Sequence, residues 1–248
     1  MDEQKRPILQ KALPMGQAKQ AAARLPSMQP VEGAWLRMDD AYGVQMAERR
    51  RLMTVRPHDV YAQLPEGRTA SRACLEEVLR ALPEGFIRTR EDVVCPDGHQ
   101  VTLDWGEPLW SIGQLLQQDI CILEKRADEH VLSGAILCFP ASWTLGQKIG
   151  KPLIGIHRPV AEYDNGIARR VQRLFDGVQM GRPLWRANHL RYDDPTLFQP
   201  RVENDPRPVG TSNAQYIRSE RQTVLRLSAP EAVAFFIHTT VIDVGLGE

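Results

Sequence analysis

A single histidine near the middle of the chain is the residue best suited to binding a metal. His157 lies in the segment KPLIGIHRPV (151–160), directly after a short apolar run and two residues before Pro159. Neutral imidazole ligates metals well near physiological pH, so a histidine at the end of a stiff apolar segment is placed to hold a metal centre. The alternative is a core histidine that is hydrogen-bonded to the backbone. The residue alone leaves both interpretations open.

A second candidate is a strand-like stretch near the C-terminus that carries many polar side chains. In YIRSERQTVLRL (216–227), alternation places Arg218, Glu220 and Gln222 on one face and Ser219, Arg221 and Thr223 on the other. The planar fork of arginine forms paired, charge-assisted bonds with carboxylates, so this strand predicts a polar lining for a carboxylate-bearing cofactor or a small polar substrate. The alternative is a solvated face whose ion pairs contribute about 0–1 kcal/mol each.

The segment RPLWRAN (182–188) adds a third set of candidates. Arg186 and Asn188 alternate with Trp185, so in a strand they face the side opposite to the indole. Trp185 itself is typical of a core residue. Four other histidines have no supporting context and are interpreted as structural or exposed: His58, His99, His130 and His238. His189 lies close to this segment but has no other support as a site residue.

Composition narrows the class of protein. The 248 residues are 42% hydrophobic and 25% charged, and Lys plus Arg equals Asp plus Glu at 31 each, which argues against a broad nucleic-acid surface. No apolar run approaches the length of a membrane-spanning helix, and the N-terminus does not read as a secretory signal. The four cysteines form no Cys-x-x-Cys pair, so they predict neither a zinc nor an iron–sulfur site, and reduced thiols in a cytoplasmic protein fit best.

Common nucleotide and hydrolase motifs are absent from the sequence. It contains no P-loop, no His-Glu-x-x-His and no Gly-x-Ser-x-Gly, and the glycines at 245 and 247 lie too near the C-terminus to open a dinucleotide-binding turn. The chain therefore shows no machinery of its own for NAD(P)H or ATP.

The elements that must position these residues begin with helices. Residues 1–30 are broken by prolines and are expected to form a loosely ordered arm. Apolar residues recur at helical spacing over 42–54 and over 69–82, and a further helix is expected over 108–118. Between the helices over 69–82 and 108–118, the turn sequence PDG (96–98) separates two short strands within 91–105. We interpret residues 31–118 as a helical layer.

Five longer strands and a helical crossover follow. Strands are predicted over 119–126 and 130–139, then over 183–192, 215–227 and 232–244. The crossover between them carries His157, a short helix capped by Ser142 and running to Lys148, and a helix over 165–178. The predicted fold class is α+β, with an antiparallel five-stranded sheet whose helices gather on one face and whose element order is that of a PAS-type domain. Residues 31–248 form one such domain, with its core over 119–244.

Several segments together resemble a known family. LSGAILCFPASWTLGQKIGKPLIGIHRPV, RPLWRAN, YDDPTLF and RSERQTVLRL occur in this order, and the similarity extends from WLRMDDAY to about residue 240. These segments resemble the haem-bearing alpha subunit of the haem-dependent oxidative N-demethylases, which is related to the haem subunit of dimethylamine monooxygenase. The resemblance implies a PAS-like fold with haem b and an O2-dependent removal of a methyl group from a small secondary amine, releasing formaldehyde. It also implies that electrons come from NADPH through flavin and an iron–sulfur centre on a partner.

The resemblance also suggests roles for individual residues. His157 corresponds to the axial ligand of the haem, with Ile156 as apolar wall and Arg186 and Arg218 as cofactor-binding residues. Tyr163, Glu220 and Arg221 are the candidate catalytic residues, of which Glu220 would orient a protonated amine. His189 stands where an aromatic residue is expected after Asn188.

Two other functions remain open. The first is a non-catalytic PAS-type sensor of haem or of a small molecule, although no effector domain or long coiled coil is visible in the sequence. The second is a scaffold subunit that has lost its cofactor, against which the presence of His157 argues.

Overall fold

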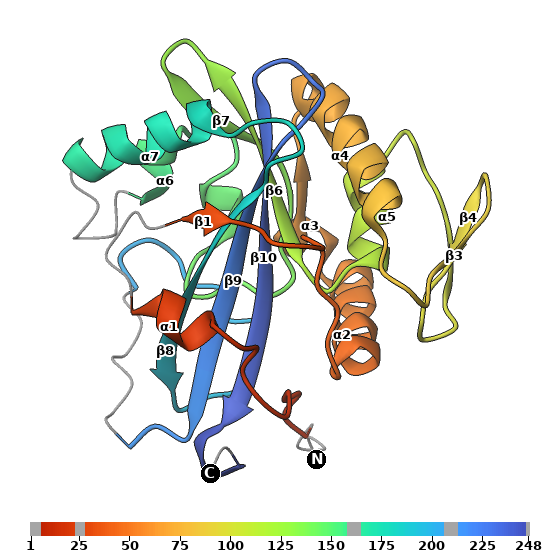
Figure 1. Cartoon of the computed structure of the whole chain (residues 1–248), viewed down its shortest axis with the longest axis vertical. Coiled ribbons are helices and arrows are strands. Elements are labelled where there is room, and N and C mark those ends of the chain that lie inside the picture. Colours follow the sequence, from red (N-terminus) through yellow and green to blue (C-terminus); the bar gives the residue numbers. More distant parts are fainter. Residues whose placement is uncertain (1–5, 23–27, 158–164, 206–212, 247–248) are drawn as a thin grey trace.

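The fold is built on one large antiparallel sheet. The computed structural model describes residues 6–22, 28–157, 165–205 and 213–246. The sheet has seven strands in the order β1-β8-β9-β10-β6-β7-β2, and Figure 1 shows the long strands β8, β9 and β10 side by side. Their bounds are β1 Gln29–Pro30, β2 Tyr61–Gln63, β6 Asp119–Arg126, β7 Glu129–Ile136, β8 Leu184–Tyr192, β9 Tyr216–Arg226 and β10 Ala232–Asp243.

The five predicted strands are all present, and the sheet is larger than predicted. The hairpin β6–β7 precedes the crossover and the meander β8–β9–β10 follows it, in the expected order. Two short segments extend the sheet beyond five strands, because β1 pairs with β8 at one edge and β2 pairs with β7 at the other. Such short edge strands carry too little alternation to be recognised in a sequence.

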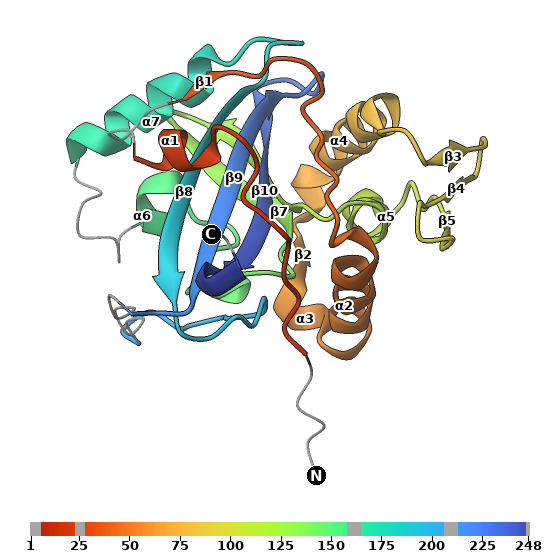
Figure 2. The same cartoon turned by 60° about the horizontal axis from the view of Figure 1, so that its bottom comes forward.

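Helices cover both faces of the sheet, so the expectation that they gather on one face is wrong. On one face lie α2 Tyr42–Val55, α3 Pro57–Val60, the 3₁₀ turn η1 Pro65–Gly67, α4 Arg68–Ala81 and α5 Pro108–Leu115. On the other lie the 3₁₀ turn η2 Leu145–Gln147, α6 Leu153–His157 and α7 Asn165–Gly177. In Figure 2 the two groups stand on opposite sides of the central strands.

The reason is that the central strands are apolar on both faces. In β10, Phe236 packs with the α2–α5 layer and its neighbour Phe235 with the crossover helices. In β6, Ile120 and Ile122 face the first layer, whereas Cys121 and Leu123 face the second. A strand that alternates two apolar sets must be covered on both sides to keep them from water.

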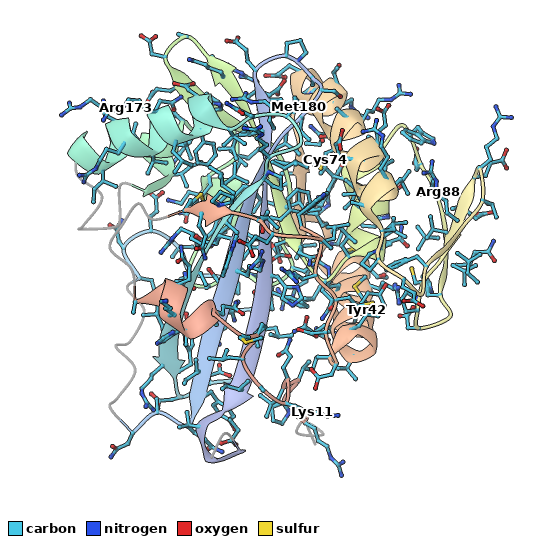
Figure 3. The ribbon with its side chains drawn as sticks, in the orientation of Figure 1. Lys11, Tyr42, Cys74, Arg88, Arg173 and Met180 are labelled. Atoms are coloured by element: carbon cyan, nitrogen blue, oxygen red, sulfur yellow. The ribbon has the colours of Figure 1, made fainter. Side chains whose placement is uncertain are left out.

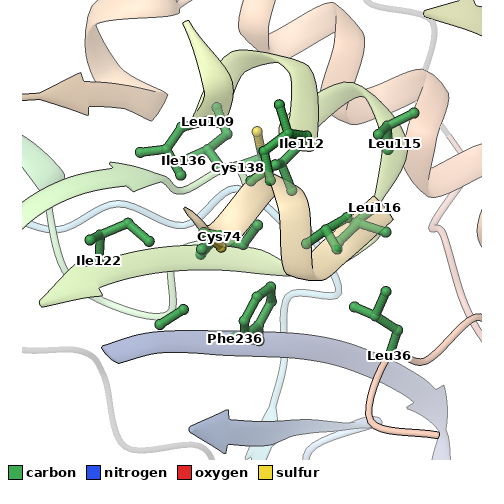
Figure 4. Close-up of a cluster of buried hydrophobic side chains, with 14 of the residues drawn as sticks. Leu36, Cys74, Leu109, Ile112, Leu115, Leu116, Ile122, Ile136, Cys138 and Phe236 are labelled. Atoms are coloured by element: carbon green, nitrogen blue, oxygen red, sulfur yellow. The ribbon is translucent and has the colours of Figure 1, made fainter. Parts of the chain in front are cut away.

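The α2–α5 layer forms the larger hydrophobic core. Cys74, Leu75, Val78 and Leu79 of α4 are buried, as their helical spacing predicts. Figure 4 shows Cys74 with Ile112 of α5, Ile122 of β6 and Phe236 of β10. Figure 3 labels Cys74 in the view of the whole chain. A small separate sheet, β3 Ile87–Arg88, β4 Asp92–Val94 and β5 Gln100–Thr102, flanks this layer and contains the predicted turn at 96–98.

In the described part of the N-terminal arm, Gln10 and Gln17 are buried, and most of the other residues are half-buried or exposed. Gln10 is buried; its backbone N–H donates to the carbonyl of Val241, and its side-chain oxygen accepts from the Val241 N–H, both at 2.9 Å. The short helix α1 Gln17–Ala21 lies beside β8 in Figures 1 and 2. The last described element is the 3₁₀ turn η3 Val244–Leu246. Among the described residues, no helix combines the length and apolarity that crossing a membrane requires.

Candidate functional site

A large cavity lies between the sheet and the crossover helices. Its volume is about 790 Å³, within the range of about 300–1,000 Å³ that is typical of ligand and cofactor sites. Its walls are mainly apolar, and come from β6, β7 and β10 on the sheet side and from α6 and α7 on the other: Cys121, Leu123, Leu132, Leu153, Ile156, Ile167, Val171, Leu174, Phe175, Phe235 and Ile237. We call it the large cavity.

Helix α7 is amphipathic and forms the outer wall. Val171, Leu174 and Phe175 line the large cavity, whereas Arg169, Arg170 and Arg173 are exposed to solvent. Figure 3 shows Arg173 on the outer side of α7, away from the sheet. The helix therefore has an apolar face toward the large cavity and a basic face toward solvent.

A smaller cavity adjoins the large one. It has a volume of about 250 Å³ and is lined by Ala141, Ser142, Asn188, Leu190, Tyr192, Arg218 and Glu220. The two cavities share three lining residues, Ala141, Ser142 and Glu220. Glu220 therefore lines both the large, mainly apolar cavity and this smaller one, which we call the small cavity.

Strand β9 supplies the polar residues at this boundary. Arg218, Glu220 and Gln222 share one face, as predicted: Glu220 and Gln222 line the large cavity, and Arg218 and Glu220 line the small one. Oε2 of Glu220 accepts hydrogen bonds from Asn188 at 3.2 Å and from Gln222 at 3.4 Å. The backbone N–H of Glu220 in turn donates to the amide oxygen of Asn188 at 3.1 Å. The carboxylate is thereby held in one orientation.

Arg218 is held by the backbone of two other segments. It is 3% exposed and donates to the carbonyls of Thr196, Leu197 and Phe139 at 2.8–3.3 Å. Its Nε lies 3.9 Å from Oε1 of Glu220, too far for a hydrogen bond. Arg218 therefore ties the start of the crossover and the loop after β8 to the central strand.

Arg186 faces the large cavity from β8. It donates to Gln222 at 2.9 Å, and burial lowers the pKa of its guanidinium while the charge of Glu220 opposes that shift. Within the described residues it forms no ion pair with a carboxylate. A half-buried arginine in this position is suited to a carboxylate on a bound ligand.

Arg221 lies on the opposite face of the sheet, so the prediction that it acts beside Glu220 is not supported by its position. Its guanidinium stacks over the ring of Trp185, 3.8 Å from the centroid, and neither side chain lines a cavity. Burial lowers the pKa of Arg221 to about 10, and the charge of Arg37 adds to the effect. Alternation along β9 separates it from Glu220.

The structure places the other predicted site residues as follows. His157 is the last residue of α6, one position after Ile156 and four after Leu153, both of which line the large cavity. A residue four positions after Leu153 lies on the same side of a helix, so the backbone of His157 ends beside this cavity. Tyr163 lies outside the described residues.

Lys148 is a cavity residue that the sequence did not indicate. It is 3% exposed, and its Nζ donates to the carbonyl of Ile156 at 2.6 Å and to Glu203 at 2.9 Å. The bond from Lys148 is the main cause of a lowered pKa at Glu203, which also pairs with Lys151 at 3.3 Å. Lys148 thus connects the end of α6 to the 201–205 loop. A lone lysine in a Gly-rich segment carries no sequence signal for such a role.

Asp119 holds the segment 138–142, which lies between the two cavities. Asp119 accepts hydrogen bonds from the backbone N–H groups of Cys138 and Phe139 and forms a fully buried ion pair with Arg49 at 2.5 Å. The predicted helix capped by Ser142 is wrong: Ser142 has a φ of +66°, and only the turn η2 follows. That left-handed backbone turns the chain between the cavities.

The histidines interpreted as structural fit that reading where they are buried. His130 pairs with Gln172 at 2.6 Å, and burial lowers the pKa of its imidazole. His238 lies between Asp39 at 2.8 Å and Gln118 at 3.0 Å. Neither lines a cavity, and the described residues contain no group of three or more His, Cys, Asp or Glu side chains that would hold a bare ion.

These residues suit a haem better than a free metal ion. A haem brings its own four nitrogen ligands, so it needs one axial side chain, apolar walls and cations for its carboxylates. The large cavity has apolar walls, and α6, which ends in a histidine, lies beside it. Its cationic lining residues are Arg186, Arg201 and Lys148.

The sequence was compared with models of known families. The model described as haem-dependent oxidative N-demethylase, alpha subunit-like, matches residues 27–245. The match includes every residue that lines the two cavities.

Proposed function

Because the chain belongs to the family of haem-dependent oxidative N-demethylase alpha subunit-like proteins, we propose that it binds haem b in the large cavity and removes a methyl group from a small secondary amine. The observation that carries the proposal is the position of α6, whose last residue is His157 and whose inner face walls an apolar cavity of about 790 Å³. The PAS-like fold is part of the proposal, and the order of hairpin, crossover and meander supports it.

Each cavity residue has a role in this proposal. His157 would ligate the haem iron, and Ile156 would contribute to the apolar wall around the haem. Arg186 pairs with a haem carboxylate, because its guanidinium is half-buried and has no carboxylate partner among the described residues. Arg218 holds the segments around Phe139 and Leu197 that border the site.

Glu220 is the residue we assign to the substrate. Its Oε1 forms no hydrogen bond within the described residues, while Oε2 is fixed by Asn188 and Gln222. A carboxylate held in this way can accept a hydrogen bond from a protonated amine and orient its methyl group toward the large cavity. Tyr163 remains a proposed catalytic residue on the resemblance alone, and Arg221 has no direct role because it faces away.

The reaction requires electrons from elsewhere. Removal of a methyl group by this route consumes O2, two electrons and two protons and yields formaldehyde, the demethylated amine and water, and the haem supplies the oxidising chemistry when bound. We propose that a partner carries the flavin and iron–sulfur centre that pass on electrons from NADPH. The description of the family as alpha subunit-like supports a partner subunit.

The second candidate is a haem or small-molecule sensor on the same PAS-like scaffold. The favouring observation is that a helical crossover covers a ligand-sized cavity on one face of the sheet. A sensor requires binding without turnover.

One experiment separates the two. Haem-loaded protein is supplied with NADPH, a ferredoxin reductase and a [2Fe–2S] ferredoxin as a surrogate electron source, and reduction of the haem is first verified anaerobically by its absorption spectrum. Dimethylamine and air are then added, and formaldehyde is measured. The enzyme proposal expects formaldehyde in proportion to amine consumed. A protein that is reduced and reoxidised without forming formaldehyde contradicts it and favours the sensor.

A further inference from the structure

The small cavity contains both an acceptor and unpartnered donors. We infer that it binds a small zwitterion, with a carboxylate directed to Arg218 and Ser142 and an ammonium directed to Glu220. Given the proposed function, on which this step rests, the zwitterion is an N-methylated amino acid. The simple secondary amine of the family resemblance would occupy only half of these groups.

The first donor is Arg218. Two of its nitrogens bind backbone carbonyls, but Nε is buried and has no hydrogen-bond partner among the described residues. Carbonyls are neutral, and the Glu220 carboxylate is 3.9 Å away, so the guanidinium charge is only partly balanced. A buried N–H group without a partner is uncommon in folded proteins and points to a ligand or a bound water.

The second donor is the hydroxyl of Ser142. Its Oγ is likewise buried and has no partner within the described residues, and the residue lines the small cavity together with Arg218. Its φ of +66° is a backbone conformation that serine rarely adopts. A strained residue with an unpaired, buried hydroxyl beside a cavity is typical of a binding role.

The acceptor in the small cavity is the carboxylate of Glu220. Its Oε2 is occupied by two amide donors, which leaves Oε1 available to a ligand. An ammonium without a carboxylate would pair with Oε1 but leave Arg218 and Ser142 unsatisfied. A carboxylate without an ammonium would meet the negative charge of Glu220. A ligand with both groups, separated by about one carbon, satisfies all three.

The size and shape of the cavity agree with such a ligand. At about 250 Å³ it is too small for a drug-sized molecule, but it has room for a molecule of a few heavy atoms. Leu190, which is 51% exposed, lines it, so the cavity reaches the surface on that side. On the other side it adjoins the large cavity at the shared residues, and the N-methyl group would point to that side.

The test is calorimetric binding to the protein without haem, so that it does not depend on turnover. N-methylglycine and N,N-dimethylglycine are compared with dimethylamine and acetate, which carry one charged group each. We expect the zwitterions to bind at least about tenfold more tightly than either single-charge probe. Equal affinity for N-methylglycine and dimethylamine, or no measurable binding of the zwitterions, overturns the inference. The two donors would then be hydrogen-bonded to water.

Two variants test the two ends separately. Ser142→Gly removes the hydroxyl, and its backbone conformation suits glycine, so the protein should fold. This variant should bind the zwitterions and acetate several-fold more weakly, and its affinity for dimethylamine should not change. Glu220→Gln should remove the preference for zwitterions over acetate. Glu76→Gln, on the exposed side of α4, is the matched control and should change nothing. A Ser142→Gly protein with unchanged selectivity contradicts the assignment.

Turnover distinguishes a failure of this inference from a failure of the proposed function. If haem-loaded protein releases formaldehyde from dimethylamine but neither binds nor demethylates the zwitterions, the proposed function holds and this inference is wrong. Protein that binds the zwitterions but forms no formaldehyde from any substrate keeps the zwitterion site and loses the N-demethylase function.

Discussion

Glu220 and Arg221 are consecutive residues of β9 whose side chains lie on opposite faces of the sheet. Glu220 lines both cavities, whereas Arg221 stacks over Trp185 at 3.8 Å, in a layer away from both. Both residues occur in the segment that resembles the family, yet only one of them can contact a ligand in the site. Strand alternation therefore decides which polar residue of this segment reaches the cavities.

The two residues should differ in their effect on turnover. Glu220→Gln removes the charge that orients the amine, and we expect it to raise the KM for the amine about tenfold or more, equivalent to about 1.4 kcal/mol, with an unchanged haem spectrum. Arg221→Met retains the packing on Trp185 and should leave KM within about twofold. Steady-state kinetics of both variants provide the measurement. A larger effect from Arg221→Met than from Glu220→Gln would reverse the assignment.

The buried pair Arg49–Asp119 should dominate the stability of the segment between the cavities. Arg49→Ala leaves Asp119 charged, buried and without its ion-pair partner, so the free energy of unfolding should fall by about 3–5 kcal/mol. Arg56→Ala, which breaks a half-exposed pair with Asp59, should cost less than about 1 kcal/mol. Urea denaturation of the two variants measures the difference. Equal losses would show that the Arg49 pair contributes no more than a surface pair.

Lys148 should position the end of α6. The last carbonyls of a helix have no partner within it, and Lys148 supplies one to Ile156 while holding Glu203. In Lys148→Met, backbone amides of α6 and of the 201–205 loop should exchange with deuterium faster. Lys151→Met is the matched control, because Lys151 also pairs with Glu203 but is 43% exposed. Identical exchange in both variants would remove the positioning role.

The network around Asp39 should make stability depend on pH in the acid range. Burial alone would raise the pKa of Asp39, but hydrogen bonds from His238, Gln117 and Gln10, with the charge of His238, lower it from 3.8 to about 2. A lowered pKa in the folded state stabilises the fold above the unfolded pKa of 3.8, and this contribution is lost as the pH falls through about 2.

Asp39→Asn should therefore lower the stability by about 2 kcal/mol at pH 7, following about 1.4 kcal/mol per pKa unit. The difference between the wild type and the variant should shrink between about pH 4 and pH 2. Thermal unfolding across this range measures it. A difference that is the same at pH 2 and pH 7 would mean that the titration of Asp39 does not contribute.

Much of the fold follows from residue patterns that are local. The apolar spacing of Cys74, Leu75, Val78 and Leu79 predicts α4, and the alternation along β10 predicts its strand. The layering was harder to predict. Phe235 and Phe236 are both apolar, so the alternation does not reveal that each faces a different helical layer. The edge strands β1 and β2 arise from tertiary pairing alone.

The candidate site was predicted where it depends on a strand and missed where it depends on tertiary contacts. The shared face of Arg218, Glu220 and Gln222 follows from alternation. Lys148 could not be found, because its role depends on the carbonyl of Ile156 and on Glu203, which is 55 residues away along the chain. The helix expected after Ser142 failed for a related reason: that segment is turned by Ser142 itself and fixed through the Asp119 contacts with Cys138 and Phe139.

The absorption spectrum of the protein expressed with added haem, alone and as His157→Ala, tests the central claim most directly. His99→Ala, which changes an exposed histidine of the small sheet region, serves as the control. The account predicts a strong Soret band for the wild type and the control, and a lost or shifted band for His157→Ala. A wild-type protein with no Soret band, or a fully haem-loaded His157→Ala protein with an unaltered spectrum, would contradict it.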